Sequence, residues 1–343
     1  MTRAVGSRGA GRAVGDGAAA AVRIGVLGCA DIALRRMLPA FAAGGGVELT
    51  AIASRDPVKA AEQAGRYGVR ALPGYAELLD LDDVEAVYVP LPAGLHAEWV
   101  AAALRAGKHV LAEKPLTTDV ALTEALLDEA AARGLVLMEN VMFVHHARHA
   151  EVRRLVAAGA IGEPRSLHAA FAVPTRTDGD IRYRPELGGG ALWDVGVYPV
   201  RAALHLLGAD LRVAGAVLSA GPGREVDTSG AALLATASGV TAQLTFGIED
   251  AYTSAYQVRG SEGHITVDRA FTPAADHVPT LRVTHGSVVR ELRLAPDDQV
   301  GNTVGAFARA VRSGVFHDPD CLRQARLLHA VRVAATTEGL TSI

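Results

Sequence analysis

From residue 21 onward, short apolar runs alternate with longer segments in which apolar side chains recur at helical spacing. The apolar runs predict buried strands at 22–28, 47–54, 84–92 and 109–113. Helices are predicted between them, at 32–44, 56–68, 94–108 and 119–133. Strands that alternate with helices of this length form βαβ units and a parallel sheet. Several of the strands are apolar throughout, which fits a sheet that helices cover on both faces.

After about residue 150 the pattern changes. Stretches such as "VTAQLTF" (240–246) alternate between apolar and polar positions, which predicts strands with one solvated face. These strands are predicted at 165–173, 211–219, 230–236, 240–248, 254–260, 263–268 and 280–294, with helices at 150–162, 301–314 and 321–339. The short turns "SGV" and "GSEGH" indicate hairpins. Residues 146–343 are therefore predicted to form an α+β domain with an open, mainly antiparallel sheet.

Composition narrows the class of protein. The 343 residues are enough for two domains, and half of them are apolar. A net charge of -3 gives no support for nucleic-acid or membrane-surface binding. No apolar stretch reaches the length of a membrane span. The two cysteines, Cys29 and Cys321, lie far apart, which favours a reducing compartment and predicts a cytoplasmic protein.

Two further segments are assigned by composition. Residues 1–20 are rich in Gly, Ala and Arg and lack the apolar core of a secretory signal, so they are expected to be a disordered tail or an upstream start-site extension, outside the fold. His145, His146 and His149 lie close together but have no acidic partner at metal spacing. No metal site is predicted, and a partly buried or interfacial histidine cluster is expected instead.

The turn after the first strand reads "GCADIA", residues 28–33. Against the dinucleotide-binding pattern G-x-G-x-x-G/A, alanine replaces the second glycine and is the allowed third residue. A plain strand–helix turn is the alternative, but the first βα turn of a parallel sheet favours a pyrophosphate on free N–H groups. Residues 21–145 are predicted to be a Rossmann dinucleotide-binding domain. The residues expected at the cofactor here are Gly28, Cys29, Ala30, Asp31 and Ile32.

The second strand ends in Ser54 and Arg55, where a site for NAD usually carries an acidic residue. An arginine can bind a 2′-phosphate, and a serine can donate a hydrogen bond to it. The alternative is that Ser54 or Asp56 only caps the next helix while Arg55 lies in solvent. The pair favours NADP(H) as cofactor.

Two more stretches place charged groups at unusual positions. "LAEKPL" (111–116) puts Lys114 where a buried strand ends, the edge at which open α/β sheets bind ligands. "GGGALWDVGVY" (188–198) places Asp194 and Tyr198 four residues apart, on one helix face, and Pro199 should kink or restart that helix. The structural alternatives are a loop salt bridge between Glu113 and Lys114, and a hydrogen-bonded core pair.

Together with "LPAGLHAEW" (91–99), these stretches make the chain resemble the Gfo/Idh/MocA family of NAD(P)-dependent sugar and diol oxidoreductases, from about Arg23 onward. "GCADIA" and residues 140–167 make it most similar to the sugar 3-ketoreductases of antibiotic deoxysugar pathways. Those enzymes use NADPH to reduce the 3-keto group of a thymidine-diphosphate 3,4-diketo-2,6-dideoxyhexose. The resemblance thus implies a dTDP-linked keto-deoxysugar as substrate.

The resemblance also implies roles for individual residues. Lys114 matches the family lysine near the reacting carbon, and Asp194 matches the acidic residue of the second motif. Tyr198 stands where many family dehydrogenases have histidine, which puts a histidine-based oxidation in doubt. Cofactor contacts are implied for Leu91, Pro92, His96, Glu113, Lys114 and Trp193.

Reduction of a ketone needs a hydride and a proton donor. Lys114 and Tyr198 are expected to share the donor role, with Asp194 orienting them. The lysine ammonium would lower the pKa of the tyrosine and ease proton transfer. Substrate contacts are expected from these three residues and from the loop before the glycine run, where they could hold the diphosphate or be solvated charges. The loop residues are Arg176, Arg182, Tyr183 and Arg184.

Other functions stay open. One is a dehydrogenase of free sugars, inositols or trans-dihydrodiols, and another is a non-catalytic NADP-binding regulator, against which the retained Lys114 argues. The open sheet of the second half should expose an apolar face, and large exposed apolar patches mark interfaces. A homodimer or homotetramer joined through that sheet is therefore expected.

Overall fold

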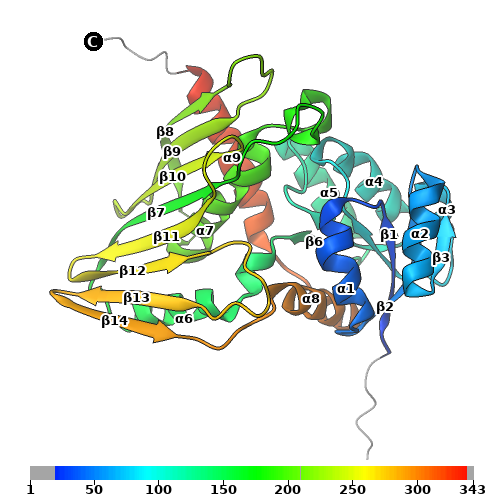
Figure 1. The fold of residues 1–343 in the computed structure, drawn as a ribbon, viewed down its shortest axis with the longest axis horizontal. Helices are drawn as coiled ribbons and strands as arrows, with labels where there is room; N and C mark the ends of the chain where they lie inside the picture. The colour runs from blue at the N-terminus through cyan, green and yellow to red at the C-terminus, as the bar shows by residue number, and fades with distance from the viewer. Residues whose placement is uncertain (1–19, 209, 338–343) are drawn as a thin grey trace, which may run out of the picture.

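The computed structural model describes residues 20–208 and 210–337. The tail predicted at residues 1–20 therefore lies outside the described residues, apart from Ala20. The chain forms two lobes, each built on its own sheet (Figure 1). None of the described helices is long and apolar enough to cross a membrane.

The first lobe holds a six-stranded parallel sheet in the order β3-β2-β1-β4-β5-β6. Its strands are β1 (Val22–Leu27), β2 (Val47–Ala53), β3 (Arg70–Leu72), β4 (Ala86–Val89), β5 (His109–Glu113) and β6 (Leu137–Asn140). The helices between them are η1 (Ala33–Met37), α1 (Leu38–Ala42), α2 (Pro57–Tyr67), α3 (Tyr75–Leu79), α4 (Ala93–Arg105) and α5 (Val120–Ala132). The strand order reverses between β1 and β4, which confirms the predicted Rossmann topology and creates a ligand-binding crevice at the carboxyl ends of these strands.

Local signals fix the ends of these helices. The Asp56 carboxylate accepts hydrogen bonds from the N–H groups of Val58 and Lys59, at 3.1 and 3.2 Å, and so caps α2. Gly68 ends the same helix at a φ of 67°. The helix predicted at 32–44 begins differently, because η1 is a π-helical turn that leads into α1. Such turns occur often at functional sites.

The second lobe holds an eight-stranded sheet in the order β14-β13-β12-β11-β7-β10-β9-β8, antiparallel except where β7 and β10 run parallel. Its strands are β7 (Pro164–Ala172), β8 (Arg212–Ser219), β9 (Ser229–Ala235), β10 (Thr241–Gly247), β11 (Thr253–Gly260), β12 (Gly263–Asp268), β13 (Thr280–His285) and β14 (Val288–Arg293). The helical segments in this part of the chain, not all of which pack on this sheet, are η2 (Met142–His145), α6 (Ala147–Ala157), η3 (Ile181–Tyr183), η4 (Pro185–Leu187), η5 (Leu192–Gly196), α7 (Val197–Leu207), α8 (Gln299–Ser313) and α9 (Pro319–Thr337). The predicted open, mainly antiparallel sheet is confirmed, although the stretch 280–294 is a hairpin of two strands that turns at Gly286.

The two faces of the second sheet differ. Along β10, Ala242, Leu244 and Phe246 are buried, whereas Gln243 and Thr245 are exposed. The buried side chains pack with residues of α6, α7 and α9 in one core, so the helices lie on a single face. In Figure 1 these helices are seen behind the strands of the sheet. The other face is left for solvent or for a partner.

The chain returns to the first lobe near its end. Helix α8 packs against α1, β1 and β2, and its Val300, Val304 and Phe307 join Val22 and Met37 in one core of the first lobe. Residues 146–343, predicted as the second domain, thus include a helix that completes the first.

Candidate active site

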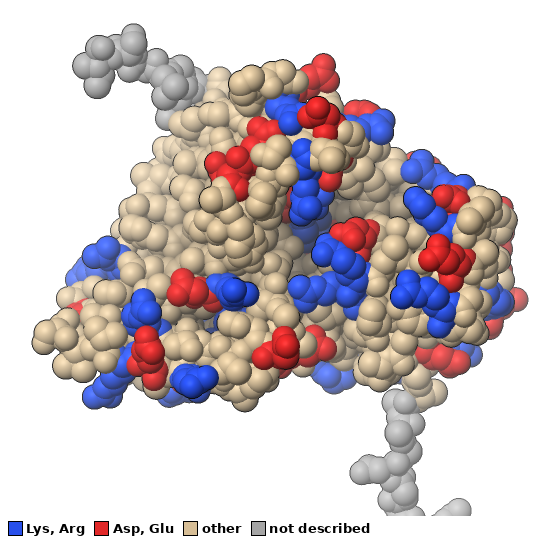
Figure 2. All heavy atoms as spheres, in the orientation of Figure 1, with Lys and Arg blue, Asp and Glu red and all other residues tan. Residues whose placement is uncertain are grey.

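The predicted reactive residues meet where the two lobes face each other. Strand β5 ends at Glu113, so Lys114 lies at the carboxyl edge of the first sheet. Asp194 lies in the π-helical turn η5, and Tyr198 lies in the first turn of α7. Figure 2 shows a hollow between the lobes with Lys and Arg side chains on both of its sides. The structure therefore brings together residues that are about 80 positions apart along the chain.

Lys114 is paired with Asp194. Its Nζ donates to the Asp194 carboxylate at 3.0 Å and to the Asp194 carbonyl oxygen at 2.6 Å. In a π-helical pattern that carbonyl would accept from residue 199, but Pro199 has no N–H. The Lys114 side chain is only 12% exposed. No ion pair joins Lys114 to Glu113 among the described residues, so the charge of the lysine is directed across the cleft.

The ionisation of this pair follows from its surroundings. Burial alone would lower the pKa of the Lys114 ammonium, but Asp194, Tyr198 and Glu113 together raise it above its ordinary value. Burial alone would raise the pKa of Asp194, but Lys114 and Arg182 lower it to about 2. Lys114 is therefore a cation and Asp194 an anion at neutral pH.

Arg182 is the third charge of the site. Its Nε donates to the second Asp194 oxygen at 2.5 Å, and its Nη1 donates to Asp180 at 3.1 Å. The Asp194 carboxylate in turn raises the pKa of Arg182 above its ordinary value. The loop is held close by glycine, because a Cβ on Gly189 would lie 2.6 Å from the Arg182 carbonyl oxygen. The sequence predicts Arg182 as a diphosphate ligand or a solvated loop charge, but in the structure its guanidinium pairs with Asp194.

Tyr198 presents its ring to the lysine. Lys114 Nζ lies 5.2 Å from the ring centroid, and the ring packs against Phe143, Phe171 and Phe271. We expected the ammonium to lower the pKa of Tyr198. The pKa is instead raised, because burial outweighs Lys114 and the carboxylates Glu113 and Asp194 add to it. Tyr198 is thus a protonated phenol.

Glu113 is held inside the first lobe. Its Oε1 accepts from the Tyr88 hydroxyl at 2.7 Å and from Asn140 Nδ2 at 2.6 Å. Burial raises the pKa of this carboxyl, although Lys114, Tyr88 and Asn140 oppose the shift. Tyr88 and Asn140 were missed from the sequence because they lie within apolar strands. They fix the end of β5 from which Lys114 projects.

His96 is fully buried and lies between two loops. Its Nε2 is 2.7 Å from the carbonyl oxygen of Leu91, and its Nδ1 is 2.9 and 3.2 Å from those of Pro115 and Leu116. Burial lowers the pKa of the ring, although these carbonyls oppose the shift. The structure therefore does not place His96 on the surface of the crevice. It joins the loops that follow β4 and β5.

The glycine-rich turn requires glycine at its first position. Gly28 has a φ of 122°, and a Cβ there would lie 3.0 Å from Leu91 and 3.6 Å from the Tyr75 hydroxyl. The helix that follows has no side-chain cap at Ile32, and the Leu34 N–H already donates to the Ala30 carbonyl oxygen at 3.0 Å. The N–H groups that precede Leu34 are therefore the ones placed to meet an anion. These features fit a dinucleotide pyrophosphate. Tyr75 was missed because only the fold brings it beside Gly28.

The end of β2 separates the two predicted phosphate ligands. Ser54 is buried, and its hydroxyl accepts from the Asp56 N–H at 3.1 Å. Arg55 is exposed, and burial raises the pKa of the nearby Tyr75 hydroxyl, which Arg55 partly offsets. Arg55 forms no ion pair with any described carboxylate, and its side-chain partner is the neutral Tyr75 hydroxyl, so its charge remains available to a ligand.

The remaining predicted residues are spread around the cleft. Tyr183 is buried and accepts from the Arg176 N–H at 3.1 Å, while the guanidinium of Arg224 stacks on its ring at 3.7 Å. Arg184 is exposed and pairs with Glu186. Of the cofactor residues, Cys29, Ala30 and Asp31 lie in the glycine-rich turn, Pro92 is the N-cap residue before α4, and Trp193 is buried in the core of the second lobe.

The histidines that were weighed as metal ligands serve the core. His149 Nδ1 lies 2.8 Å from the Tyr256 hydroxyl and its Nε2 lies 3.1 Å from the Ala270 carbonyl oxygen. Within the described ranges, no group of three or more His, Cys, Asp or Glu side chains is arranged to hold a metal ion.

Comparisons with known proteins fit both lobes. Residues 22–141 match the model of the oxidoreductase family with an NAD-binding Rossmann fold, and residues 149–266 match the GFO/IDH/MocA C-terminal domain. A dTDP-3,4-didehydro-2,6-dideoxy-α-D-glucose 3-reductase of Streptomyces violaceoruber is 54% identical over 327 residues, which cover 92% of this chain and 96% of the relative. The enzyme of the same name from Actinomadura kijaniata is 52% identical over 317 residues, with the same coverage.

A solved structure is also similar. The crystal structure of KijD10, a 3-ketoreductase from Actinomadura kijaniata in complex with NADP and TDP-benzene, has a TM-score of 0.89 to this chain. The two chains are 52% identical, and the match covers 92% of this chain and 98% of KijD10.

Proposed function

The chain belongs to the Gfo/Idh/MocA family of oxidoreductases, and on that premise we propose that it uses NADPH to reduce the 3-keto group of a dTDP-linked keto-deoxysugar. One observation carries the proposal. The Lys114 ammonium lies at the carboxyl edge of the first sheet, between Asp194 and the ring of Tyr198, where a reacting carbonyl oxygen would need a cation and a proton.

The cofactor fits the first lobe. Gly28 gives the turn its positive φ, the N–H groups of the following helix can meet the pyrophosphate, and Arg55 can bind the 2′-phosphate. Leu91 and Pro92 flank the same crevice, while His96 and Glu113 support its walls from within. When bound, NADPH supplies the hydride.

Lys114 supplies the positive charge. As the substrate carbonyl is reduced, negative charge develops on its oxygen, and a fixed ammonium stabilises that charge because it needs no reorganisation. Asp194 keeps Lys114 protonated and Arg182 keeps Asp194 ionised. Either Lys114 or the Tyr198 hydroxyl can then donate the proton.

The relatives support these roles. Solved KijD10 variants replace one lysine and one tyrosine, each in a complex with TDP-benzene and NADP. Those two positions are separated by the same number of residues as Lys114 and Tyr198. For the substrate diphosphate we propose Arg176 and the Tyr183 loop, since Arg182 is already paired within the site.

A coupled assay tests the function. The purified chain, supplied with the enzymatically formed dTDP-3,4-diketo-2,6-dideoxyhexose, should oxidise NADPH and yield the 3-hydroxy sugar. Turnover of free sugars, inositols or trans-dihydrodiols instead would favour the dehydrogenase alternative. Binding of NADPH without turnover of any of these compounds would favour the regulator.

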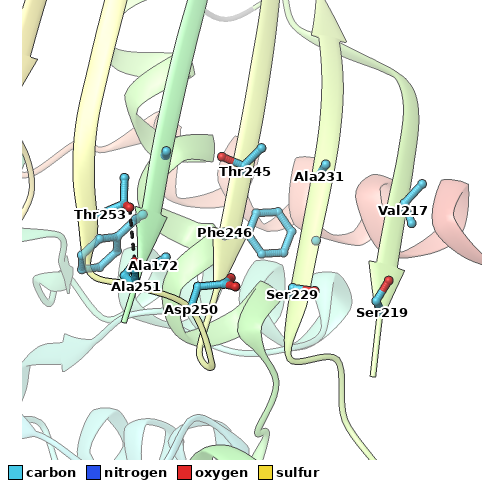
Figure 3. Close-up of a pocket in the computed structure, with 13 residues that line it drawn as sticks. Ala172, Val217, Ser219, Ser229, Ala231, Thr245, Phe246, Asp250, Ala251 and Thr253 are labelled. Atoms are coloured by element: carbon cyan, nitrogen blue, oxygen red, sulfur yellow. Dashed lines mark hydrogen bonds between the residues drawn. The ribbon is translucent and has the colours of Figure 1, made fainter. Parts of the chain in front are cut away.

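We further propose a homodimer or homotetramer joined through the outer face of the second sheet. Figure 3 shows this face with Thr245, Ala231 and Val217 on neighbouring strands and the helices behind them. The cavity drawn there is about 600 Å³ and is lined mainly by small side chains. Val217 and Leu233 are 43% and 41% exposed on this lobe, and such apolar exposure favours association.

Light scattering tests the assembly. Leu233→Glu should reduce the molar mass in solution, whereas the control Val58→Glu, at an exposed apolar position of α2, should not. A monomeric parent protein at micromolar concentration would contradict the proposal.

The cytoplasmic location stays a prediction. Cys29 and Cys321 are both free thiols in the structure.

A further inference from the structure

A buried polar cluster lies behind the Lys114 turn. Glu139, on β6, is 4% exposed, and its Oε1 accepts from the Leu116 N–H at 2.9 Å and from Gln324 Nε2 at 2.8 Å. Leu116 lies two residues beyond Lys114, so Glu139 holds the turn that carries the lysine. Gln324 belongs to α9, so the same carboxylate oxygen also reaches the second lobe.

Arg201 extends the cluster to α7. Its Nη2 donates to Asp318 at 2.6 Å, and its Nη1 lies 3.9 Å from Glu139 Oε2. Glu139 Oε2 and Arg201 Nη1 are both buried and have no hydrogen-bond partner among the described residues. Unpaired buried charges are destabilising unless an opposite charge faces them, which each of these two provides for the other.

Helix α7, which carries Arg201, also carries Tyr198, one of the two proposed proton donors. Tyr198 and Arg201 are three residues apart on α7, so they lie on neighbouring positions of one face. The Lys114 turn is therefore joined to this helical segment twice, once by the contact of Lys114 with Asp194 and once through Leu116, Glu139 and Arg201.

We propose that Glu139 and Arg201 are positioning residues that fix the Lys114 turn relative to α7, and thereby set where Lys114 and Tyr198 stand against the keto group. This inference rests on the proposed function. Neither side chain reaches the cleft, so neither is a catalytic residue. Their effect passes through the Leu116 N–H and through the backbone of α7.

The ionisation of Glu139 depends on the groups packed around it. Burial raises the pKa of Glu139 to about 7. Arg201 opposes this rise, whereas Asp318 adds to it. Burial and Glu139 hold the pKa of the neighbouring Cys321 thiol well above its ordinary value. The groups that face Glu139 thus come from the turn, from α7 and from α9.

Three single variants and one double variant test the positioning role. Glu139→Leu removes both contacts at similar volume, and we expect kcat on the keto-sugar to fall about 10- to 100-fold, the effect of a misplacement near 1 Å. NADPH affinity should change little. Glu139→Gln keeps an acceptor for Leu116 and should retain most of kcat. Arg201→Met should lower kcat, and combined with Glu139→Leu it should add little.

Lys108→Met is the matched control. Lys108 is also buried, and its Nζ donates to the carbonyl oxygens of Leu81 and Val84 at 2.7 and 2.9 Å, before the start of β5. Its loss should lower the melting temperature and leave kcat per folded molecule unchanged. If Glu139→Leu lowers kcat per folded molecule no more than Lys108→Met does, the positioning role is wrong.

A second readout needs no substrate. Hydrogen exchange of the peptide that contains Leu116 should become faster in Glu139→Leu and stay unchanged in Lys108→Met. Unchanged exchange in Glu139→Leu would overturn the inference. If the parent protein fails to reduce the keto-sugar, the proposed function falls, while this exchange measurement still decides whether Glu139 holds the turn.

Discussion

The reacting end of the proposed site and its nucleotide end hold their charges differently. At the reacting end, Lys114, Asp194 and Arg182 are mostly buried and paired with one another. At the nucleotide end, Arg55 is exposed and pairs with no described carboxylate. Charge that develops during a reaction is stabilised best by groups already in place, whereas a phosphate brings its own charge to a free arginine. In the proposed mechanism, the buried set acts in the reaction and Arg55 selects the cofactor.

Removing the donors should give the largest effect. General acid catalysis contributes roughly 100- to 10,000-fold, and a donor that another group can replace should cost toward the lower figure. We expect Tyr198→Phe and Lys114→Ala each to lower kcat without abolishing turnover, and the double variant to lose more. NADPH affinity should change little for Tyr198→Phe. Steady-state kinetics of all three variants provide the measurement.

One outcome would break the shared-donor mechanism. If Tyr198→Phe alone were as inactive as the double variant, Tyr198 would be the sole acid and Lys114 would only support it.

Loss of the Asp194 carboxylate should have the next largest effect. Burial lowers the pKa of Lys114 and Asp194 opposes that shift, so Asp194→Asn should lower it. Because the protonated lysine is the working form, the alkaline limb of the kcat profile should move to lower pH. Asp180→Asn is the control, since Asp180 pairs with Arg182 but not with Lys114. Equal profiles for the two variants would count against Asp194 as the group that keeps Lys114 charged.

The nucleotide end should respond more weakly. A hydrogen bond to a charged group contributes about 1.5–3 kcal/mol, and exposure places Arg55 at the low end, near tenfold in affinity. Arg55→Ala should narrow the preference for NADPH over NADH by about that factor. Arg66→Ala, an exposed position of α2, should leave it unchanged. Fluorescence titration measures both, and equal affinities for the two cofactors in the parent protein would remove the basis of the prediction.

The smallest effect concerns stability. An unfolded glutamate has a pKa near ~4.3, and Glu139 has a pKa of about 7 in the fold. A raised carboxyl pKa favours the fold at low pH, so the advantage is complete below about 4.3 and is lost as pH rises toward 7. The melting temperature of the parent protein should therefore fall relative to Glu139→Gln between pH 5 and 7.5.

Glu151→Gln is the control for that measurement. Arg154 lowers the pKa of Glu151, so the charge of Glu151 does not change between pH 5 and 7.5. The difference in melting temperature between the parent protein and Glu151→Gln should therefore not vary with pH. A flat difference for Glu139→Gln as well would show that its carboxyl does not titrate as described.

Hydrophobic periodicity predicted most of the fold. The strand at 109–113 was predicted with the bounds that β5 has, and Asp56 and Gly68 marked the ends of α2. These features depend on neighbours in sequence, which a pattern records. The hairpin of β13 and β14 was missed because the sequence from 280 to 294 has the pattern of one continuous strand, and a single glycine, Gly286, is the only sign of the turn.

The contacts of the site could not be read in the same way. Lys114 and Asp194 are 80 residues apart, and nothing local shows that the lysine pairs across the cleft rather than with Glu113. Arg182 was predicted to hold substrate because the sequence gives the charge of a loop arginine but does not reveal that Asp194 is its partner. Glu139 was missed because only the packing of two helices against β6 surrounds it with polar groups.

The return of α8 to the first lobe affects how the chain can fold as it is synthesised. Domains usually fold in order as they leave the ribosome. Here Val300, Val304 and Phe307 complete a core that begins with Val22, so that core is incomplete until nearly the whole chain has been made. A nascent chain that ends before residue 299 exposes the apolar surface that α8 covers. The cofactor lobe, although it begins first, therefore finishes folding together with the second lobe.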